Sequence, residues 1–159
     1  MRNTLQQINI SYVPAEDRLL MKVSVSGAGE YRIWLTRRYI GLLANVLNDQ
    51  INREGGFQEL ASSKATLQSL RGGAFEQAYE PQPQQSYPLG EKGVLGFRIN
   101  AGKTDADVLN LQLLPEQGEG ISLALDKSML YMLMNLLEQG LASTDWNLHL
   151  SLSVNQPVH

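Results

Sequence analysis

Residues 30–50, EYRIWLTRRYIGLLANVLNDQ, change their apolar period in the middle, and no loop separates the two parts. In the first part the apolar residues alternate, as they do on one face of a β-strand; these are Tyr31, Ile33 and Leu35. In the second part they recur every three or four residues, as on one face of a helix; these are Tyr39, Leu42, Leu43, Val46 and Leu47. Thr36 stands between them and is a good helix N-cap residue. The stretch predicts a strand that enters a helix directly at Thr36.

The same order of patterns occurs ninety residues later, where Asp126 takes the place of Thr36. Before each cap, a Gly-containing turn separates two alternating runs, which predicts a β-hairpin. In the first hairpin the inward positions before the turn are Leu19, Met21, Val23 and Val25. In the second hairpin they are Leu109, Leu111 and Leu113, then Ile121, Leu123 and Leu125. The second helix carries an apolar stripe at matching positions, Met129, Met132, Leu133, Leu136 and Leu137.

Each half also has an earlier candidate strand, at Ile8, Ile10 and Tyr12 in the first and at Leu95, Phe97 and Ile99 in the second. We therefore predict an α+β fold, in which an internal duplication of a βββα unit builds antiparallel sheets covered by two helices. The alternative is chance similarity between two strand–helix units.

The chain of 159 residues is predicted to form a single domain with an apolar core. Residues 1–54 form the first predicted unit, and residues 93–159 form the second unit with a final strand over 146–154, WNLHLSLSV. Residues 55–92 connect the two units and include the Pro/Gln-rich run EPQPQQSYP, which we expect to be partly irregular.

Composition narrows the class of protein. The chain has no Cys, no apolar run near the length of a membrane span, and no apolar signal-peptide region in its start, MRNTLQQINIS. We therefore expect a cytoplasmic protein that does not bind membranes. A net charge of −3 argues against a protein whose main task is coating nucleic acid.

Candidate catalytic and metal-binding residues are few. His149 falls on the polar face of the last predicted strand, and His159 ends the chain. The acidic residues Asp105, Asp107, Glu116 and Glu119 lie in predicted turns, and their spacing fits no calcium loop. We find no nucleotide-binding or nucleophile motif in the sequence. These observations predict a protein that is not an enzyme and has no metal or cofactor.

A basic face is the main candidate binding site. If the alternating apolar residues of the first hairpin point inward, several basic residues and one Trp point outward, and two more arginines begin the helix. These residues are Arg18, Lys22, Arg32, Trp34, Arg37 and Arg38. Cations beside an exposed aromatic ring are typical of single-stranded nucleic-acid binding. The alternative is structural: acidic residues such as Glu30 pair with the arginines, and the connecting segment covers the ring.

The second helix has more apolar residues than one face needs. Outside its stripe it carries Leu130, Tyr131 and Met134, so it is predicted to be buried on more than one side. We predict a homodimer with these residues at or near its interface; the alternative is direct packing of the two helices inside one chain.

Three stretches, RIWLTRRYIGLL (32–43), DRLLMKVS (17–24) and ISLALDKSMLYMLMNLL (121–137), resemble a family of small conserved hypothetical proteins of proteobacteria. The resemblance covers nearly the whole chain and implies a bacterial cytoplasmic protein, but it assigns no activity and no functional residues. The strand-then-helix order is also similar to that of the Whirly and PC4-like folds, which generally have four strands per unit where the first unit here shows three.

Two functional hypotheses follow. The first is a non-catalytic cytoplasmic binding or scaffold protein that contacts an unidentified protein partner. The second is a single-stranded nucleic-acid-binding module that uses the basic face of the first hairpin.

Overall fold

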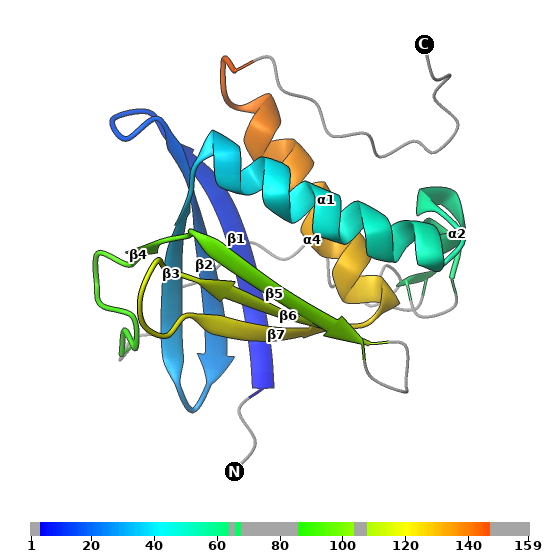
Figure 1. The fold of residues 1–159 in the computed structure, drawn as a ribbon, viewed down its shortest axis with the longest axis horizontal. Coiled ribbons are helices and arrows are strands. Elements are labelled where there is room, and N and C mark those ends of the chain that lie inside the picture. The colour runs from blue at the N-terminus through cyan, green and yellow to red at the C-terminus, as the bar shows by residue number, and fades with distance from the viewer. Residues whose placement is uncertain (1–3, 64–65, 68–85, 104–107, 147–159) are drawn as a thin grey trace.

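The computed structural model describes residues 4–63, 66–67, 86–103 and 108–146, and it has an α+β fold (Figure 1). In the first half the elements are β1 (Thr4–Val13), β2 (Arg18–Ser26), β3 (Gly29–Leu35), α1 (Arg37–Arg53) and α2 (Phe57–Ala61). In the second half they are β4 (Val94–Leu95), β5 (Arg98–Lys103), β6 (Leu109–Leu114), β7 (Ile121–Leu125) and α4 (Lys127–Ala142). The predicted final strand over 146–154 lies outside the described residues after Trp146.

The strands form two sheets, ordered β1-β2-β3-β4 and β5-β6-β7. All neighbouring pairs are antiparallel except β3 and β4, which are parallel. Each three-stranded meander is followed at once by a helix. The Thr36 side chain accepts from the Tyr39 N–H at 3.1 Å, and the Asp126 side chain accepts from the Met129 N–H at 2.9 Å. The predicted strand-to-helix junctions are therefore confirmed.

The core lies between the two sheets and the two long helices. Most of the predicted inward residues of β2, β3, β6 and β7 are buried, among them Leu19, Met21, Ile33, Leu111 and Leu123, whereas Val25 and Tyr31 are half-buried. The helix α4 packs against β1, β7, α1 and α2, and thus uses its broad apolar surface within the chain.

This placement bears on the residues predicted for a homodimer interface. Leu130 and Met134 are 1% and 0% exposed, so they are core residues of the single chain. Tyr131 is half-buried and stacks on Phe57, with ring centroids 5.3 Å apart. In this fold, Leu130 and Met134 have no surface to offer a second copy.

The predicted strand through Leu95, Phe97 and Ile99 is divided between the two sheets. Leu95 pairs with Trp34 in the first sheet, whereas Ile99 pairs with Leu113 in the second. The chain crosses between them at Gly96, whose N–H donates to the Trp34 carbonyl at 2.9 Å. An alternating pattern shows which side chains share a face, but it does not show which strand supplies the hydrogen bonds.

Tyr39 of α1 is fully buried at this crossing. Its hydroxyl donates to the Arg98 carbonyl at 2.9 Å, and burial raises the pKa of that hydroxyl to about 12. A Cβ atom at Gly96 would lie 2.7 Å from a ring carbon of Tyr39. The absence of a side chain at Gly96 therefore lets the ring and the crossing chain approach each other.

We predict that Gly96→Ala lowers the free energy of unfolding by about 1–3 kcal/mol, because the added methyl group overlaps a ring that cannot move aside. The matched control is Gly102→Ala in β5, where a Cβ atom would meet nothing within 4 Å. Urea denaturation followed by circular dichroism measures both variants. Equal stabilities for the two would contradict the close packing of Gly96 on Tyr39.

Candidate protein-binding surface

The first hairpin places part of the predicted basic face as expected. Lys22 pairs with Arg32 across β2 and β3, and Leu20 pairs with Trp34, so these side chains share the face opposite to the buried Leu19. Arg18 lies on the same face of β2, within 3.8 Å of the Glu16 carboxylate.

Arg32 is committed to contacts within the protein. Its Nε donates to Oε2 of Glu30 at 2.6 Å, and the Glu30 side chain is only 1% exposed. Its Nη1 donates to the Glu91 carbonyl at 2.6 Å, and the guanidinium lies 4.5 Å from the centroid of the Tyr87 ring. Arg32 thus compensates a buried carboxylate and anchors the segment that precedes β4.

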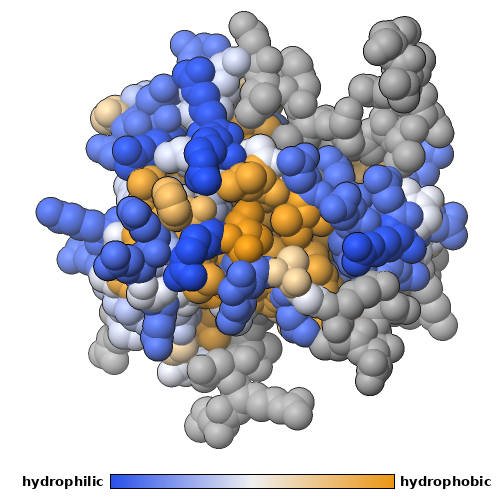
Figure 2. Space-filling model, in the orientation of Figure 1, coloured by the Kyte–Doolittle hydropathy of each residue, from blue (hydrophilic) through white to orange (hydrophobic). Residues whose placement is uncertain are grey.

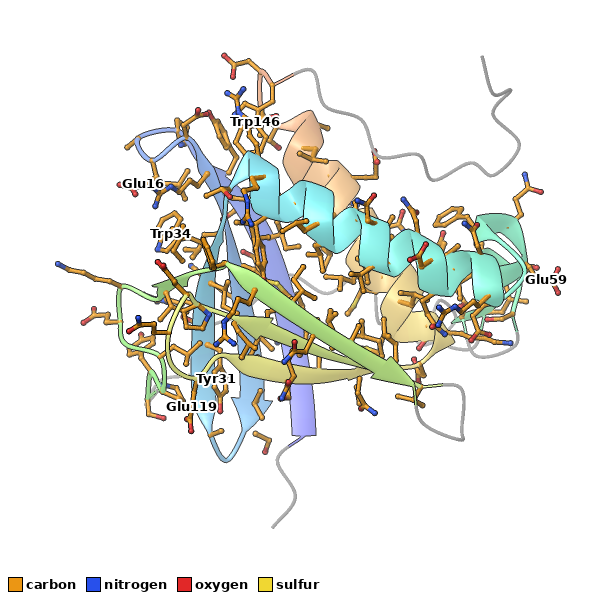
Figure 3. All side chains as sticks on the ribbon, in the orientation of Figure 1. Glu16, Tyr31, Trp34, Glu59, Glu119 and Trp146 are labelled. Carbon is orange, nitrogen blue, oxygen red and sulfur yellow. The ribbon has the colours of Figure 1, made fainter. Side chains whose placement is uncertain are left out.

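Trp34 is tied to the same segment. Its Nε1 donates to the Lys92 carbonyl at 2.8 Å, and its backbone pairs with β4, so the half-buried ring lies beside that strand (Figure 3). Gly93 also packs closely here, since a Cβ atom there would lie 2.6 Å from the Arg32 carbonyl oxygen. The connecting segment therefore covers part of the face that the sequence pattern suggested for nucleic-acid binding.

Arg37 and Arg38 contact different elements. The Nη2 of Arg37 lies 3.2 Å from Oδ2 of Asp17, and its guanidinium lies 4.8 Å from the Trp146 ring centroid. The guanidinium of Arg38 lies 5.0 Å from the Phe97 ring centroid. The two guanidinium groups therefore lie near different aromatic rings, those of Trp146 and Phe97.

Asp17 is the centre of a polar cluster that joins distant parts of the chain. Its Oδ1 accepts from Nε1 of Trp146 at 2.7 Å and from the Tyr12 hydroxyl at 2.7 Å. These two hydrogen bonds, the one from Trp146 first, hold the pKa of Asp17 below its ordinary value. The cluster fastens the β1–β2 turn to the start of α1 and to the residues after α4. We interpret it as a structural contact.

An apolar groove between α1 and β5 was not predicted from the sequence. Leu42, predicted to face the core, is 39% exposed, and Val46, one turn later, is half-buried. Across from them on β5, Ile99 is half-buried and Ala101 is exposed. We call these four residues, together with Gln50, the α1–β5 groove. In the sequence, the one available signal is the wide apolar arc of α1, which includes Ile40 as well as the predicted stripe.

The groove is hollowed at one end and continues into exposed apolar surface at the other. The hollow has a volume of about 170 Å³ and is lined by Val46, Asp49, Gln50, Arg53, Ala101, Gly102 and Leu109. At the opposite end Phe97 is 39% exposed, and Leu95, two residues earlier in the chain, is 40% exposed. Figure 2 shows a hydrophobic patch in the middle of the face on which α1 and β5 lie, bordered by hydrophilic residues.

Gln50 brings an unsatisfied acceptor to this groove. The side chain is 3% exposed, and its Nε2 donates to Oε1 of Glu54 at 2.9 Å. Among the described residues, its Oε1 has no hydrogen-bond partner. Leaving a buried carbonyl oxygen unpaired costs about 1–3 kcal/mol.

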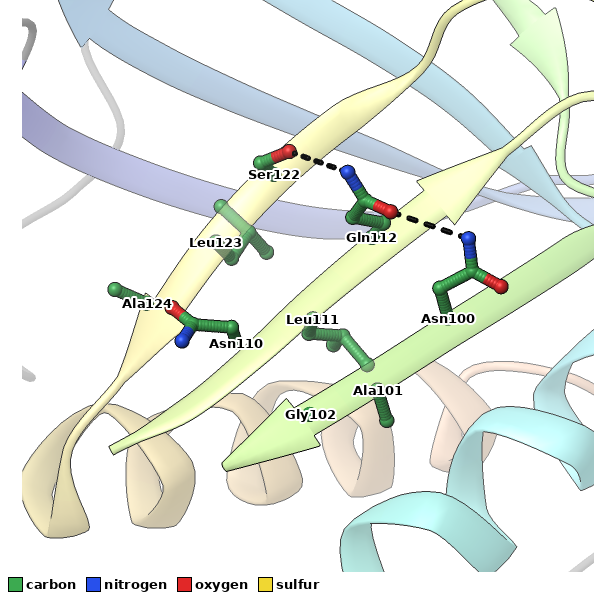
Figure 4. A pocket seen from close by; sticks show the side chains of 9 residues that line it. All are labelled: Asn100, Ala101, Gly102, Asn110, Leu111, Gln112, Ser122, Leu123 and Ala124. Carbon is green, nitrogen blue, oxygen red and sulfur yellow. Dashed lines mark hydrogen bonds between the residues drawn. The ribbon is translucent and has the colours of Figure 1, made fainter. Parts of the chain in front are cut away.

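A second, larger hollow of about 510 Å³ lies over β5, β6 and β7 (Figure 4). A ladder of side-chain hydrogen bonds crosses it, from Asn100 to Gln112 at 3.1 Å and from Gln112 to Ser122 at 3.4 Å. Its other lining residues are Ala101, Gly102, Asn110, Leu111, Leu123 and Ala124, so none of its lining side chains is charged. This surface is polar, but its amides already satisfy one another in part.

Comparison with protein-family models, curated proteins and solved structures finds no match to this chain. Within the described ranges, no group of three His, Cys, Asp or Glu residues could hold a metal ion. The helices in those ranges are too short or too polar to cross a membrane. The surfaces of the described residues are therefore the basis of the function proposed below.

We predict that Arg32→Ala lowers the free energy of unfolding by about 2–3 kcal/mol, because it leaves the buried Glu30 carboxylate without its cation. Lys22→Ala removes the neighbouring cation on the same face and should change stability by less than about 0.5 kcal/mol. Adding Glu30→Gln to Arg32→Ala should restore part of the loss. Equal stability of Arg32→Ala and wild type in urea denaturation would contradict the structural role that we assign to Arg32.

The pH dependence of stability tests the Asp17 cluster. The folded-state pKa of Asp17 lies below the unfolded-state value, so the ionised group stabilises the fold above about pH 4, and this contribution is lost as the pH falls through the folded-state pKa. We expect Asp17→Asn to be less stable than wild type at neutral pH and to lose less stability on acidification. Denaturation followed by tryptophan fluorescence measures this. Glu16→Gln, the matched control, should keep the wild-type acid profile.

Proposed function

We propose that the protein is a non-catalytic cytoplasmic binding or scaffold protein, and that it contacts its protein partner through the α1–β5 groove. The observation that carries the proposal is the exposure of three large apolar side chains, Leu42, Leu95 and Phe97, at about two-fifths each. A contiguous apolar surface with a polar border is typical of protein–protein contact sites.

Leu42 and Phe97 lie on one surface, and Leu95 precedes Phe97 by two residues in the chain. Arg38 is one helical turn before Leu42, and its guanidinium lies over the Phe97 ring, so α1 and the start of β5 meet there. An Arg beside exposed aromatic and aliphatic groups is common at the energetic centre of protein interfaces.

The contacts of the basic residues favour this function over nucleic-acid binding. Arg32 and Arg37 are paired with Glu30 and Asp17, and Arg18 lies near Glu16. A phosphate backbone at these arginines competes with their carboxylate partners, one of which is buried. Lys22 and Arg38 have no ion pair among the described residues, and two separate cations are a weak site for a polyanion.

We also infer that β1–β2–β3–α1 and β5–β6–β7–α4 derive from one duplicated βββα unit. The inference is supported by the equal element order and by the two caps, Thr36 and Asp126, which correspond in the sequence. Both helices pack against several elements, α4 against β1, β7, α1 and α2, and α1 against β3, β5, α2 and α4. The more apolar helix is α4, whereas α1 keeps the exposed Leu42 beside the groove. In a duplicated fold, one helix can thus be buried in the core while the other keeps an exposed surface for binding.

Site-specific photo-crosslinking in cells of the native host tests the proposed function. We expect Leu42→p-benzoylphenylalanine to form a discrete cross-linked protein product on irradiation, because the side chain there faces the partner. The matched control is Gln112→p-benzoylphenylalanine on the amide-lined sheet face, which should give no such product. The second substitution Phe97→Asp should remove the product formed at position 42.

Cross-links to nucleic acid at position 42, or equal products at positions 42 and 112, would contradict the proposal. A product of twice the chain's mass, composed of this chain alone, would identify a second copy as the partner and make the protein a homodimer through α1.

A further inference from the structure

We propose that the edge of β1 binds the segment that follows Trp146, residues 147–154 (NLHLSLSV), as an added antiparallel strand beside α4. The segment lies outside the described residues. Its docking site, by contrast, consists of β1, one flank of α4 and Trp146, which the structure describes. This inference does not depend on the α1–β5 groove and goes beyond the proposed function.

The strand β1 is a long edge strand without charged residues. Among the described residues it pairs with β2 and with no other strand, and from Ile8 to Val13 this pairing is regular. Its ten residues, TLQQINISYV, include no Lys, Arg, Asp, Glu or Pro. Proteins commonly protect an edge strand with a charge, a proline or a covering segment. The lack of charge and proline therefore favours pairing of β1 with a further strand.

The helix α4 lies on the face of the first sheet rather than along the edge of β1. A Cβ atom at Gly140 would lie 3.0 Å from Cγ2 of Ile10 and 3.2 Å from Cδ1 of Leu19. Both side chains point inward from the sheet, Ile10 from β1 and Leu19 from its neighbour β2. A strand can therefore add beside β1 without entering between the helix and the sheet.

The two flanks of α4 beside Gly140 differ in burial. On one flank Leu137 and Leu141 are buried. On the other flank Leu136 and Met132 precede Gly140 by one and two helical turns, and both are half-buried. The buried flank faces the interior of the protein. Because β1 is the outer strand of its sheet, the half-buried flank faces the space beside its edge, where apolar residues of an added strand would cover it.

Trp146 places the start of the segment beside the end of β1. Its ring packs edge-on against the Tyr12 ring, with centroids 5.8 Å apart, and its Nε1 donates to Oδ1 of Asp17 at 2.7 Å. Tyr12 is near the last residue of β1, and Asp17 is in the turn that follows. A strand that begins at Trp146 and runs antiparallel to β1 therefore needs no connecting loop. Trp146 and the segment together have nine residues, close to the ten of β1.

The apolar pattern of the segment matches the inward face of β1. With Trp146 opposite Tyr12, every second residue of the segment falls opposite an inward residue of β1, because residue numbers in an antiparallel pair have a constant sum. The resulting apolar pairs are Leu148 with Ile10 and Leu150 with Ile8. On the outer face, His149 falls opposite Asn9, so polar residues also meet polar residues. The register joins like faces along the pair.

Cysteine pairs test this placement, because the chain has no Cys. We expect Asn9→Cys/His149→Cys to form a disulfide within one chain on mild oxidation, since the two positions face each other across neighbouring strands. The matched control is Asn9→Cys/Ser153→Cys, whose second position is displaced along the strand by about 13 Å and should stay reduced. Intact-mass spectrometry detects the bond, and gel electrophoresis without reductant shows whether it joins one chain or two.

Amide hydrogen exchange of the full chain, measured by two-dimensional NMR, tests the backbone pairing. In an antiparallel edge strand the N–H of every second residue points away from its neighbour. We expect these edge-facing amides of residues 8–13 to exchange about a hundredfold or more slowly than in an unstructured chain. Leu150→Asp should remove that protection, whereas His149→Asp, on the outer face, should keep it. Continued protection of the amides bonded to β2 shows that each variant is folded.

Three results would overturn the inference: fast exchange of the edge-facing amides in wild type, protection that Leu150→Asp leaves unchanged, and equal disulfide yields in the two cysteine pairs. If Leu150→Asp does not fold, the cysteine pairs and the wild-type exchange rates still decide. A disulfide that joins two chains would also overturn it and assign the segment to the β1 edge of a second copy. None of these measurements involves position 42, so the proposed function is tested separately.

Discussion

The buried contact between Tyr39, Gly96 and the Arg98 carbonyl is the constraint on which the two-sheet arrangement depends. Tyr39 belongs to the helix of the first half, whereas Gly96 and Arg98 belong to the chain that crosses from the first sheet into the second. The ring fills the space that Gly96 leaves, and its hydroxyl satisfies a backbone oxygen. One side chain thereby sets the distance between α1 and the start of β5, and the groove beyond them opens from that point.

The two arginines that begin α1 can be understood from their neighbours. In the first turn of a helix each positive charge opposes the dipole by about 0.3–1 kcal/mol. Arg37 gains an ion pair with Asp17 and a ring contact with Trp146, and Arg38 gains a ring contact with Phe97. Both side chains extend away from α1 and contact residues outside this helix, which holds its first turn in place. Each arginine makes its own tertiary contact. These contacts explain why both stand in the first turn of α1 without a shared anionic ligand.

The outer face of the first hairpin illustrates how a connecting segment changes the meaning of a sequence pattern. Alternation correctly placed Arg32 and Trp34 on the outside of β3. Residues 86–95 then run along that strand, where Ser86 and Lys92 accept hydrogen bonds from it and β4 pairs with it. The outer face of this sheet is thus partly covered by another segment of the protein. By contrast, Leu42 beside the groove keeps 39% of its surface exposed, and this is the surface we propose for binding.

Local patterns in the chain were enough to predict the α+β class, the inward faces of β2, β3, β6 and β7, and the two capped junctions, because period and capping depend on residues close together in the chain. They also correctly predicted that α4 is buried on several sides. It took the packing of distant segments to place Leu95 and Ile99 in different sheets, to bury Leu130 and Met134 in the core, and to leave Leu42 exposed. Each of these depends on a neighbour distant in sequence, and the helical period of α1 cannot show how much of its apolar arc the second sheet covers.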